Sequence, residues 1–152
     1  MSATAPVDEH ELAAPARPDG PHDPDVALTT LPSGLRIVSQ RMDHAATVSL
    51  GIWIGAGSRD ELANEHGLAH LLEHMAFKGT ARRSALEIAE EIESVGGDLN
   101  AATSVEYTCY TARVLGSDLG LAVDILADII TSPSLTEEEL KREKGVILQE
   151  IS

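Results

Sequence analysis

The 152-residue sequence contains few basic residues, one cysteine and no long hydrophobic run. Its 11 Lys and Arg residues stand against 25 Asp and Glu residues, which gives a formal net charge of −14. A surface this acidic repels phosphate backbones and anionic lipids, so it argues against binding to nucleic acids or to a membrane. It would instead attract basic peptides.

The single cysteine, Cys109, excludes an intramolecular disulfide framework and fits a reducing compartment, so the expected location is the cytoplasm. No apolar run approaches the roughly 20 residues that cross a bilayer. The N-terminus also lacks a basic segment followed by an apolar core. We therefore expect neither a membrane anchor nor a signal peptide.

The first 25 residues differ in composition from the rest. They hold five of the seven prolines, six acidic residues and one basic residue, with almost no large apolar side chains. Such a segment cannot bury enough apolar surface to offset the entropy of ordering, so residues 1–25 are expected to form a disordered, acidic, Pro-rich tail. Residues 26–152 are long enough for one folded domain.

The folded part begins with strand patterns. The segments 26–31 and 35–41 flank the turn residues 32–34 (Pro-Ser-Gly) and predict a hairpin. Residues 47–54 are rich in β-branched side chains and almost continuously apolar, which predicts a third strand buried on both faces.

Two helices are expected next. Asn64 can cap a helix that runs to about Lys78, where Gly79 suits a left-handed C-terminal position. Residues 84–87 (Ser-Ala-Leu-Glu) form a capping box for a second helix, which the glycines at 96–97 end.

The remaining segments repeat this order. Residues 99–114 predict one long strand, or two strands joined near 104–106, and residues 117–133 predict an apolar helix. A second capping box at 136–139 opens a helix that runs towards the chain end. Strands, two helices, strands and two helices favour an α+β fold, in which a two-layer domain has a mixed β-sheet covered by helices on one face.

The residues that carry chemistry lie on the first expected helix. His70 and His74 are four residues apart, so both imidazoles project from one helix face and can share a metal ion. Glu73 lies beside them and can take a proton from water that the metal activates. A lone histidine is more often an ordinary surface residue, but the complete H-x-x-E-H pattern with apolar flanks is a zinc motif.

Catalytic zinc usually takes three protein ligands, so a third ligand must come from elsewhere. His66 lies about 12 Å from His74 along the helix, too far to share an ion with it. Cys109 sits in a strand pattern and is better explained as a buried structural thiol. Glu150 is a plausible third ligand, and Glu143 shares its helix face. Spacing alone does not distinguish Glu150 from the acids at 137–139. Those acids are more simply explained as charges that the helix dipole favours in the first turn.

These motifs resemble the pitrilysin/insulinase family of zinc peptidases, which includes the mitochondrial processing peptidase. The resemblance covers residues 28–152. The family signature is met by Gly57, Gly67, Ala69, His70, Glu73, His74, Phe77, Gly79 and Thr80.

The resemblance implies a LuxS/MPP-like metallohydrolase fold that binds one Zn²⁺ per chain. In the family the third ligand is a glutamate about 76 residues after the second histidine, which here is Glu150; a further important glutamate precedes it by seven residues, here Glu143. The run at 96–101 resembles a turn into an edge strand that pairs with the substrate backbone, so Asn100 and Ala101 are expected to contact substrate. A plain hairpin strand after a Gly-Gly helix stop would fit this run equally well.

The resemblance therefore implies a zinc-dependent endopeptidase that acts on extended peptides or unfolded protein segments. Relatives are much longer and have two similar halves that close around the peptide, so this chain is expected to be an N-terminal portion that is completed by a second half or subunit. The alternative is a non-catalytic subunit or zinc-binding assembly module. A third possibility is a lyase of the same fold with Cys109 as ligand, but Cys109 lies too close to His74 in the sequence for that pattern.

Overall fold

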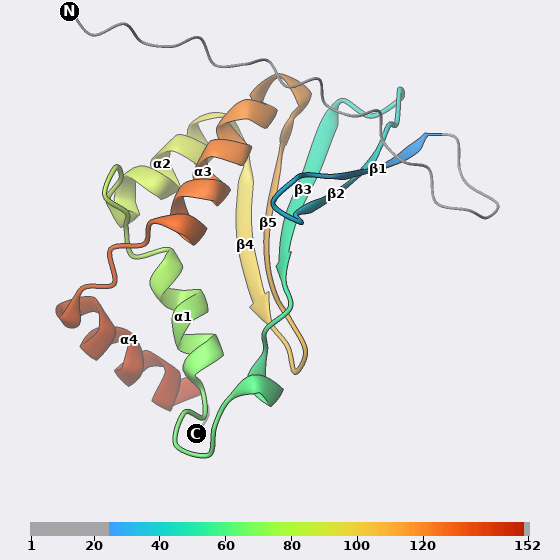
Figure 1. The fold of residues 1–152 in the computed structure, drawn as a ribbon. Coiled ribbons are helices and arrows are strands. Elements are labelled where there is room, and N and C mark those ends of the chain that lie inside the picture. Colours follow the sequence, from blue (N-terminus) through green and yellow to red (C-terminus); the bar gives the residue numbers. More distant parts are fainter. Residues whose placement is uncertain (1–24, 151–152) are drawn as a thin grey trace, which may run out of the picture. The chain divides into compact units, whose positions relative to one another are not determined.

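The computed structural model describes residues 25–150 as two compact units that divide between Ala45 and Ala46 (Figure 1). The tail expected at residues 1–25 lies outside the described residues, apart from Asp25. The first described unit holds one hairpin, and the second holds a sheet, four α-helices and all the candidate site residues.

The hairpin of the first unit confirms the sequence prediction. Strand β1 (Val26–Thr30) pairs antiparallel with β2 (Arg36–Gln40), and Leu28 lies opposite Val38. Between the strands, Gly34 has a φ of 88° and donates its backbone N–H to the carbonyl of Leu31 at 2.9 Å.

The second unit contains a three-stranded sheet in the order β3-β5-β4. Strand β3 spans Thr47–Ile54, β4 spans Asp98–Thr103 and β5 spans Thr108–Leu115. The segment 99–114 is thus a strand pair, as one of the two predictions had it. Both pairings in this sheet are antiparallel, so the expected mixed sheet is wrong for the described residues. Strands β3 and β4 do run parallel, but β5 folds back between them and separates them.

Helices cover one face of this sheet (Figure 1). Helices α1, α2 and α3 lie against the strands, and α4 packs on α1. Their bounds are α1 Leu68–Ala76, α2 Ala85–Ser94, α3 Leu119–Thr131 and α4 Glu137–Glu150, with short 3₁₀ turns η1 (Ser58–Asp60) and η2 (Gly116–Asp118). In the part of the chain that the structure describes, no helix has the length and apolar character needed to cross a bilayer.

The core lies between the sheet and the helices. This arrangement confirms the α+β fold class that the sequence predicted. The fully buried Ile125, Leu126 and Ile129 of α3 pack with Ile88 and Ile92 of α2. They meet the inward side chains of β5, which are Tyr110, Ala112 and Val114. Burial of these side chains is the main force that holds the layers together.

Strand β3 is not buried on both faces, which corrects the prediction for residues 47–54. None of its eight residues is fully buried, and Trp53 is 65 % exposed. The physical reason is that the helices of this unit pack on a single face of the sheet. A strand in such a sheet needs only one buried face, however apolar its other positions are.

The start of α1 also differs from the prediction. The helix begins at Leu68 and not near Asn64, because Gly67 has a left-handed φ of 88° and interrupts the helical path. Glu61 supplies the cap: its two carboxylate oxygens accept the backbone N–H groups of Ala69 and Gly67, both at 2.9 Å. These hydrogen bonds lower the pKa of Glu61. The cap therefore comes from a residue well outside the helix.

The other helix ends follow the sequence signals. Ser84 and Glu87 make the predicted reciprocal capping box at the start of α2. Thr136 accepts the backbone N–H of Glu139 at the start of α4. After α1, Gly79 has a φ of 115°, in line with the left-handed residue expected there.

Candidate metal centre

The structure brings His70, His74 and Glu150 together. The two histidines lie one turn apart on α1, and Glu150 comes from the end of α4, which packs beside it. The Nε2 atoms of His70 and His74 are 3.1 Å apart. The Glu150 Oε2 atom lies 3.5 Å from the first and 3.8 Å from the second.

These spacings suit zinc. Zinc binds imidazole nitrogen and carboxylate oxygen at about 2.0–2.2 Å in tetrahedral geometry, so two of its ligand atoms lie about 3.3–3.6 Å apart. The three separations in the structure, 3.1, 3.5 and 3.8 Å, bracket this range. The side chains of His70, His74 and Glu150 are 35 %, 20 % and 48 % exposed, so an ion could enter and still keep an open position. Two nitrogens and one carboxylate are the donor set of many catalytic zinc sites.

Glu143 lies behind His74. Its Oε2 atom is 3.0 Å from Nδ1 of His74, and its Oε1 atom accepts a hydrogen bond from Nζ of Lys78 at 2.7 Å. Burial would raise the pKa of this carboxyl group, but Lys78 and His74 outweigh it and the pKa is lowered. Glu143 is therefore held as a carboxylate. A partner on Nδ1 directs the Nε2 lone pair of the imidazole towards a metal.

Glu73 occupies the other side of the centre. Its carboxylate accepts a hydrogen bond from the Thr103 hydroxyl group on β4. The buried ring of Tyr110 lies nearby, and burial together with the charge of Glu73 raises the pKa of that phenol. Glu73 is therefore oriented by β4, and it is not one of the three clustered ligand candidates His70, His74 and Glu150.

Two open hollows meet at Glu73. The larger, of about 510 Å³, is lined by His70 and Glu73 of α1 together with Ser58 and residues 102–105. The smaller, of about 290 Å³, is lined by Glu73 and His74 of α1, by the following residues Phe77 and Lys78, and by residues 99–101 of β4. Glu73 lines both hollows, His70 lines the larger one and His74 the smaller one.

Strand β4 forms the edge of its sheet among the described residues, because it pairs only with β5. The backbone carbonyl of Asn100 faces β5, where the Thr111 hydroxyl group reaches it at 3.4 Å. Backbone groups alternate along a strand, so the N–H of Ala101 points to the open side. There it donates to the side-chain oxygen of Asn100 at 2.8 Å. Asn100 and Ala101 thus lie on the exposed edge beside the centre.

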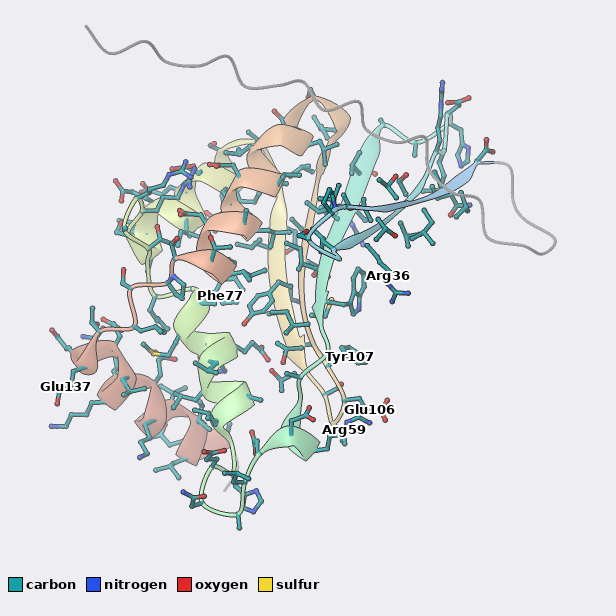
Figure 2. All side chains as sticks on the ribbon, in the orientation of Figure 1. Arg36, Arg59, Phe77, Glu106, Tyr107 and Glu137 are labelled. Atoms are coloured by element: carbon teal, nitrogen blue, oxygen red, sulfur yellow. The ribbon has the colours of Figure 1, made fainter. Side chains whose placement is uncertain are left out.

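The loop before α1 is anchored to the turn between β4 and β5. Ser58 and Arg59 donate backbone N–H groups to the carbonyls of Ser104 and Val105 at 3.1 and 3.0 Å. Figure 2 shows the Arg59 side chain beside Glu106, which it contacts at 2.6 Å. Gly57 is buried here, and a Cβ at this position would collide with the same two carbonyls. This contact explains why the motif has a glycine at 57.

The other ligand candidates lie elsewhere. The His66 side chain is 75 % exposed, and its Nδ1 atom lies 3.8 Å from Glu61. Cys109 is a buried free thiol on β5, and burial raises its pKa. The acids at 137–139 lie in the first turn of α4, where two of them pair with Arg142. None of these belongs to the His70, His74 and Glu150 cluster.

Sequence reasoning missed three residues that support the site. Lys78 lies four residues after His74, and that spacing could have indicated its place beside the histidine. Thr103 alternates with Leu99 and Ala101 on the half-buried side of β4, so the strand period could have placed it towards α1. Glu61 carries no pattern that would reveal its capping role.

Residues 36–152 match the family model described as Insulinase (Peptidase family M16). The chain belongs to this family. Among its curated relatives, an uncharacterized zinc protease of Streptomyces coelicolor is 50 % identical over 127 residues, which cover 84 % of this chain and 28 % of the relative. The human mitochondrial-processing peptidase subunit beta is 51 % identical over 128 residues, which cover 84 % of this chain and 26 % of the relative.

The structural comparison agrees with the family assignment. A protease from Helicobacter pylori superimposes with a TM-score of 0.78 at 30 % identity, over 82 % of this chain and 30 % of the protease. The insulinase-family chain therefore spans less than a third of the length of these relatives.

Proposed function

We propose that this chain carries the zinc centre of an endopeptidase that hydrolyses extended peptides or unfolded protein segments. The observation that carries the proposal is the cluster of His70, His74 and Glu150, whose donor atoms all lie within 4.8 Å of one another. The names of relatives, which include zinc proteases and a processing peptidase subunit, favour the same chemistry.

One zinc ion per chain would be held by His70, His74 and Glu150, with Glu143 behind His74. Bound zinc polarises a water molecule and lowers the pKa of that water from 15.7 to about 7. Glu73 is the carboxylate placed to accept the proton, because it borders both hollows and Thr103 fixes its orientation. It would then deliver this proton to the leaving amine.

The peptide would add to the free edge of β4 as a further strand. The backbone N–H of Ala101 would donate to a substrate carbonyl once the Asn100 side chain has turned away from it. Asn100 would then be free to contact the same peptide. Because backbone groups provide this affinity, the edge would accept many sequences, and the net charge of −14 would favour basic ones.

We further propose that a second, similar half or subunit completes the chamber around the peptide, and that the protein works in the cytoplasm. The human relative is named as a subunit of a processing peptidase, and it supports the first of these proposals. Nucleic acids and membranes are not expected partners of so acidic a chain.

Replacement of Glu73 tests the proposed function. In the protein that carries this chain, Glu73→Gln should keep zinc binding and lower the hydrolysis of an unstructured basic peptide by about 10²–10⁴-fold. Glu90→Gln, an equal change at an exposed site on α2, is the control. Unchanged hydrolysis in Glu73→Gln would refute the peptidase proposal. Zinc binding without any hydrolysis by the wild-type protein would select the alternative, a zinc-binding assembly module.

A further inference from the structure

Lys78 lies next to the metal centre, two residues beyond the end of α1. Backbone hydrogen bonds continue the last turn of this helix, because Phe77 and Lys78 donate to the carbonyls of His74 and Met75, both at 3.2 Å. Lys78 therefore follows His74 by one helical turn and lies on the same side of α1. Its side chain is 31 % exposed, so it is partly covered by its surroundings.

The Lys78 ammonium group contacts the carboxylate that supports His74. Glu143 has a side chain that is 5 % exposed, and both of its oxygens are engaged: Oε1 by Lys78 at 2.7 Å and Oε2 by His74 at 3.0 Å. Across residues 25–150, Lys78 is the only Lys or Arg with a nitrogen within 4 Å of this carboxylate. A buried carboxylate that keeps a single partner can rotate, whereas one with a partner on each oxygen is fixed.

We propose that Lys78 is a positioning residue of the metal centre: it holds Glu143 in place, and Glu143 in turn directs the Nε2 atom of His74 towards the metal. The chain of contacts runs from Lys78 through Glu143 to His74. The Nε2 atom of His74 lies 3.1 Å from Nε2 of His70. The inference rests on the zinc site of the proposed function, but it does not depend on peptide hydrolysis.

Lys78 also lines the smaller hollow together with Asn100 and Ala101. A competing role for Lys78 is therefore to contact the peptide alone, for example by pairing with a substrate carboxylate. That role would change the KM for peptides and leave zinc affinity untouched. The two roles are separated by measuring zinc binding in the absence of any peptide.

The experiment measures the zinc dissociation constant of the full chain by competition with a chromophoric chelator. Lys78→Met should weaken zinc binding by about tenfold or more, the effect usual for groups that orient a metal ligand. Lys78→Arg should restore most of the affinity, because it keeps a charged donor. Lys141→Met removes the same charge from an exposed position on α4 and should bind zinc like the wild type.

A double-variant cycle tests whether Lys78 acts through Glu143. If it does, the Lys78→Met, Glu143→Gln double variant should bind zinc no more weakly than Glu143→Gln alone. Fully additive losses would overturn the inference, as would zinc binding by Lys78→Met within twofold of the wild type. A wild-type chain that binds no zinc would overturn the proposed function together with this inference.

A spectroscopic measurement covers the case in which Lys78→Met is too unstable for the binding assay. In the metal-free chain, carbon chemical shifts of the His74 ring report which nitrogen carries the proton. The wild type and Lys78→Arg should show the tautomer with hydrogen on Nδ1. A lower population of this tautomer in Lys78→Gln, which keeps a donor without the charge, supports the inference, and an unchanged population contradicts it.

Discussion

Thr103 donates a hydrogen bond to Glu73, and this contact joins strand β4 to helix α1 beside the two histidines. Thr103 lies on the half-buried side of β4. The proposed base is therefore held by the same strand whose edge would receive the peptide. A shift of β4 would move the base and the substrate together.

Removal of the Thr103 hydroxyl group should lower activity without affecting zinc. Thr103→Val keeps the shape and strand propensity of the residue but leaves Glu73 without this donor. A hydrogen bond to a charged group contributes about 1.5–3 kcal/mol, so kcat for peptide hydrolysis should fall by about tenfold or more. Thr47→Val on the exposed start of β3 is the matched control. Weaker zinc binding in Thr103→Val would show that the hydroxyl group supports the ligands instead.

Zinc should stabilise the chain, because its ligands are in place only in the folded state. At a zinc concentration about 100 times the dissociation constant, the gain is about 2.7 kcal/mol, which corresponds to a rise of about 5–10 °C in Tm. His70→Ala should abolish the rise. His66→Ala should keep it, because His66 lies on the same segment but outside the cluster. Scanning calorimetry with and without a chelator measures both.

Gly57→Ala should destabilise the loop that borders the larger hollow. The added methyl group would collide with the backbone carbonyls of Ser104 and Val105, which forces the loop and the β4–β5 turn apart. Such overpacking costs about 1–3 kcal/mol. Gly55→Ala is the control from the same loop, because a Cβ there meets no atom within 4 Å. Urea unfolding of both variants should show a lower midpoint for Gly57→Ala alone.

Acid should weaken a charge cluster that ties the segment after α1 to α3. The guanidinium groups of Arg82 and Arg83 hold the pKa of Asp124 at about 2, below its ordinary value of 3.8. Because the folded pKa is the lower one, the stabilisation is complete above the ordinary value and is lost as the pH falls towards about 2. Urea midpoints measured from about pH 6 downwards should fall less steeply in Asp124→Asn. Parallel curves for the two proteins would contradict this.

Local signals in the sequence predicted most elements of the fold. The capping box of Ser84 and Glu87 and the hairpin turn at residues 32–34 depend on neighbouring residues, and the structure confirms both. For residues 99–114 the sequence allowed one long strand or two, and the structure has two. The start of α1 was placed too early, because its cap is Glu61 and not Asn64. These hydrogen bonds span six and eight residues and follow neither the helix nor the strand period, so spacing does not reveal them.

The site, too, combines residues that a local pattern predicts with residues that it does not. The motif put His70, Glu73 and His74 on one helix through the 3.6-residue period. Glu150 and Glu143 depended on resemblance to a family, because no local pattern shows that α4 packs on α1. The structure places both beside the histidines, and their roles remain proposals. The exposed face of β3 was missed because an apolar run does not show how many of its faces will be covered.

The hydrogen bond between the Asn100 side chain and the backbone N–H of Ala101 has a consequence for the protein at rest. An open strand edge is a template on which other chains can add and aggregate. Here the side chain already satisfies one of the donors on that edge, so a chance encounter with another strand gains less than it would from a bare edge. A peptide that adds to this edge, as proposed, would first have to displace the contact between Asn100 and Ala101.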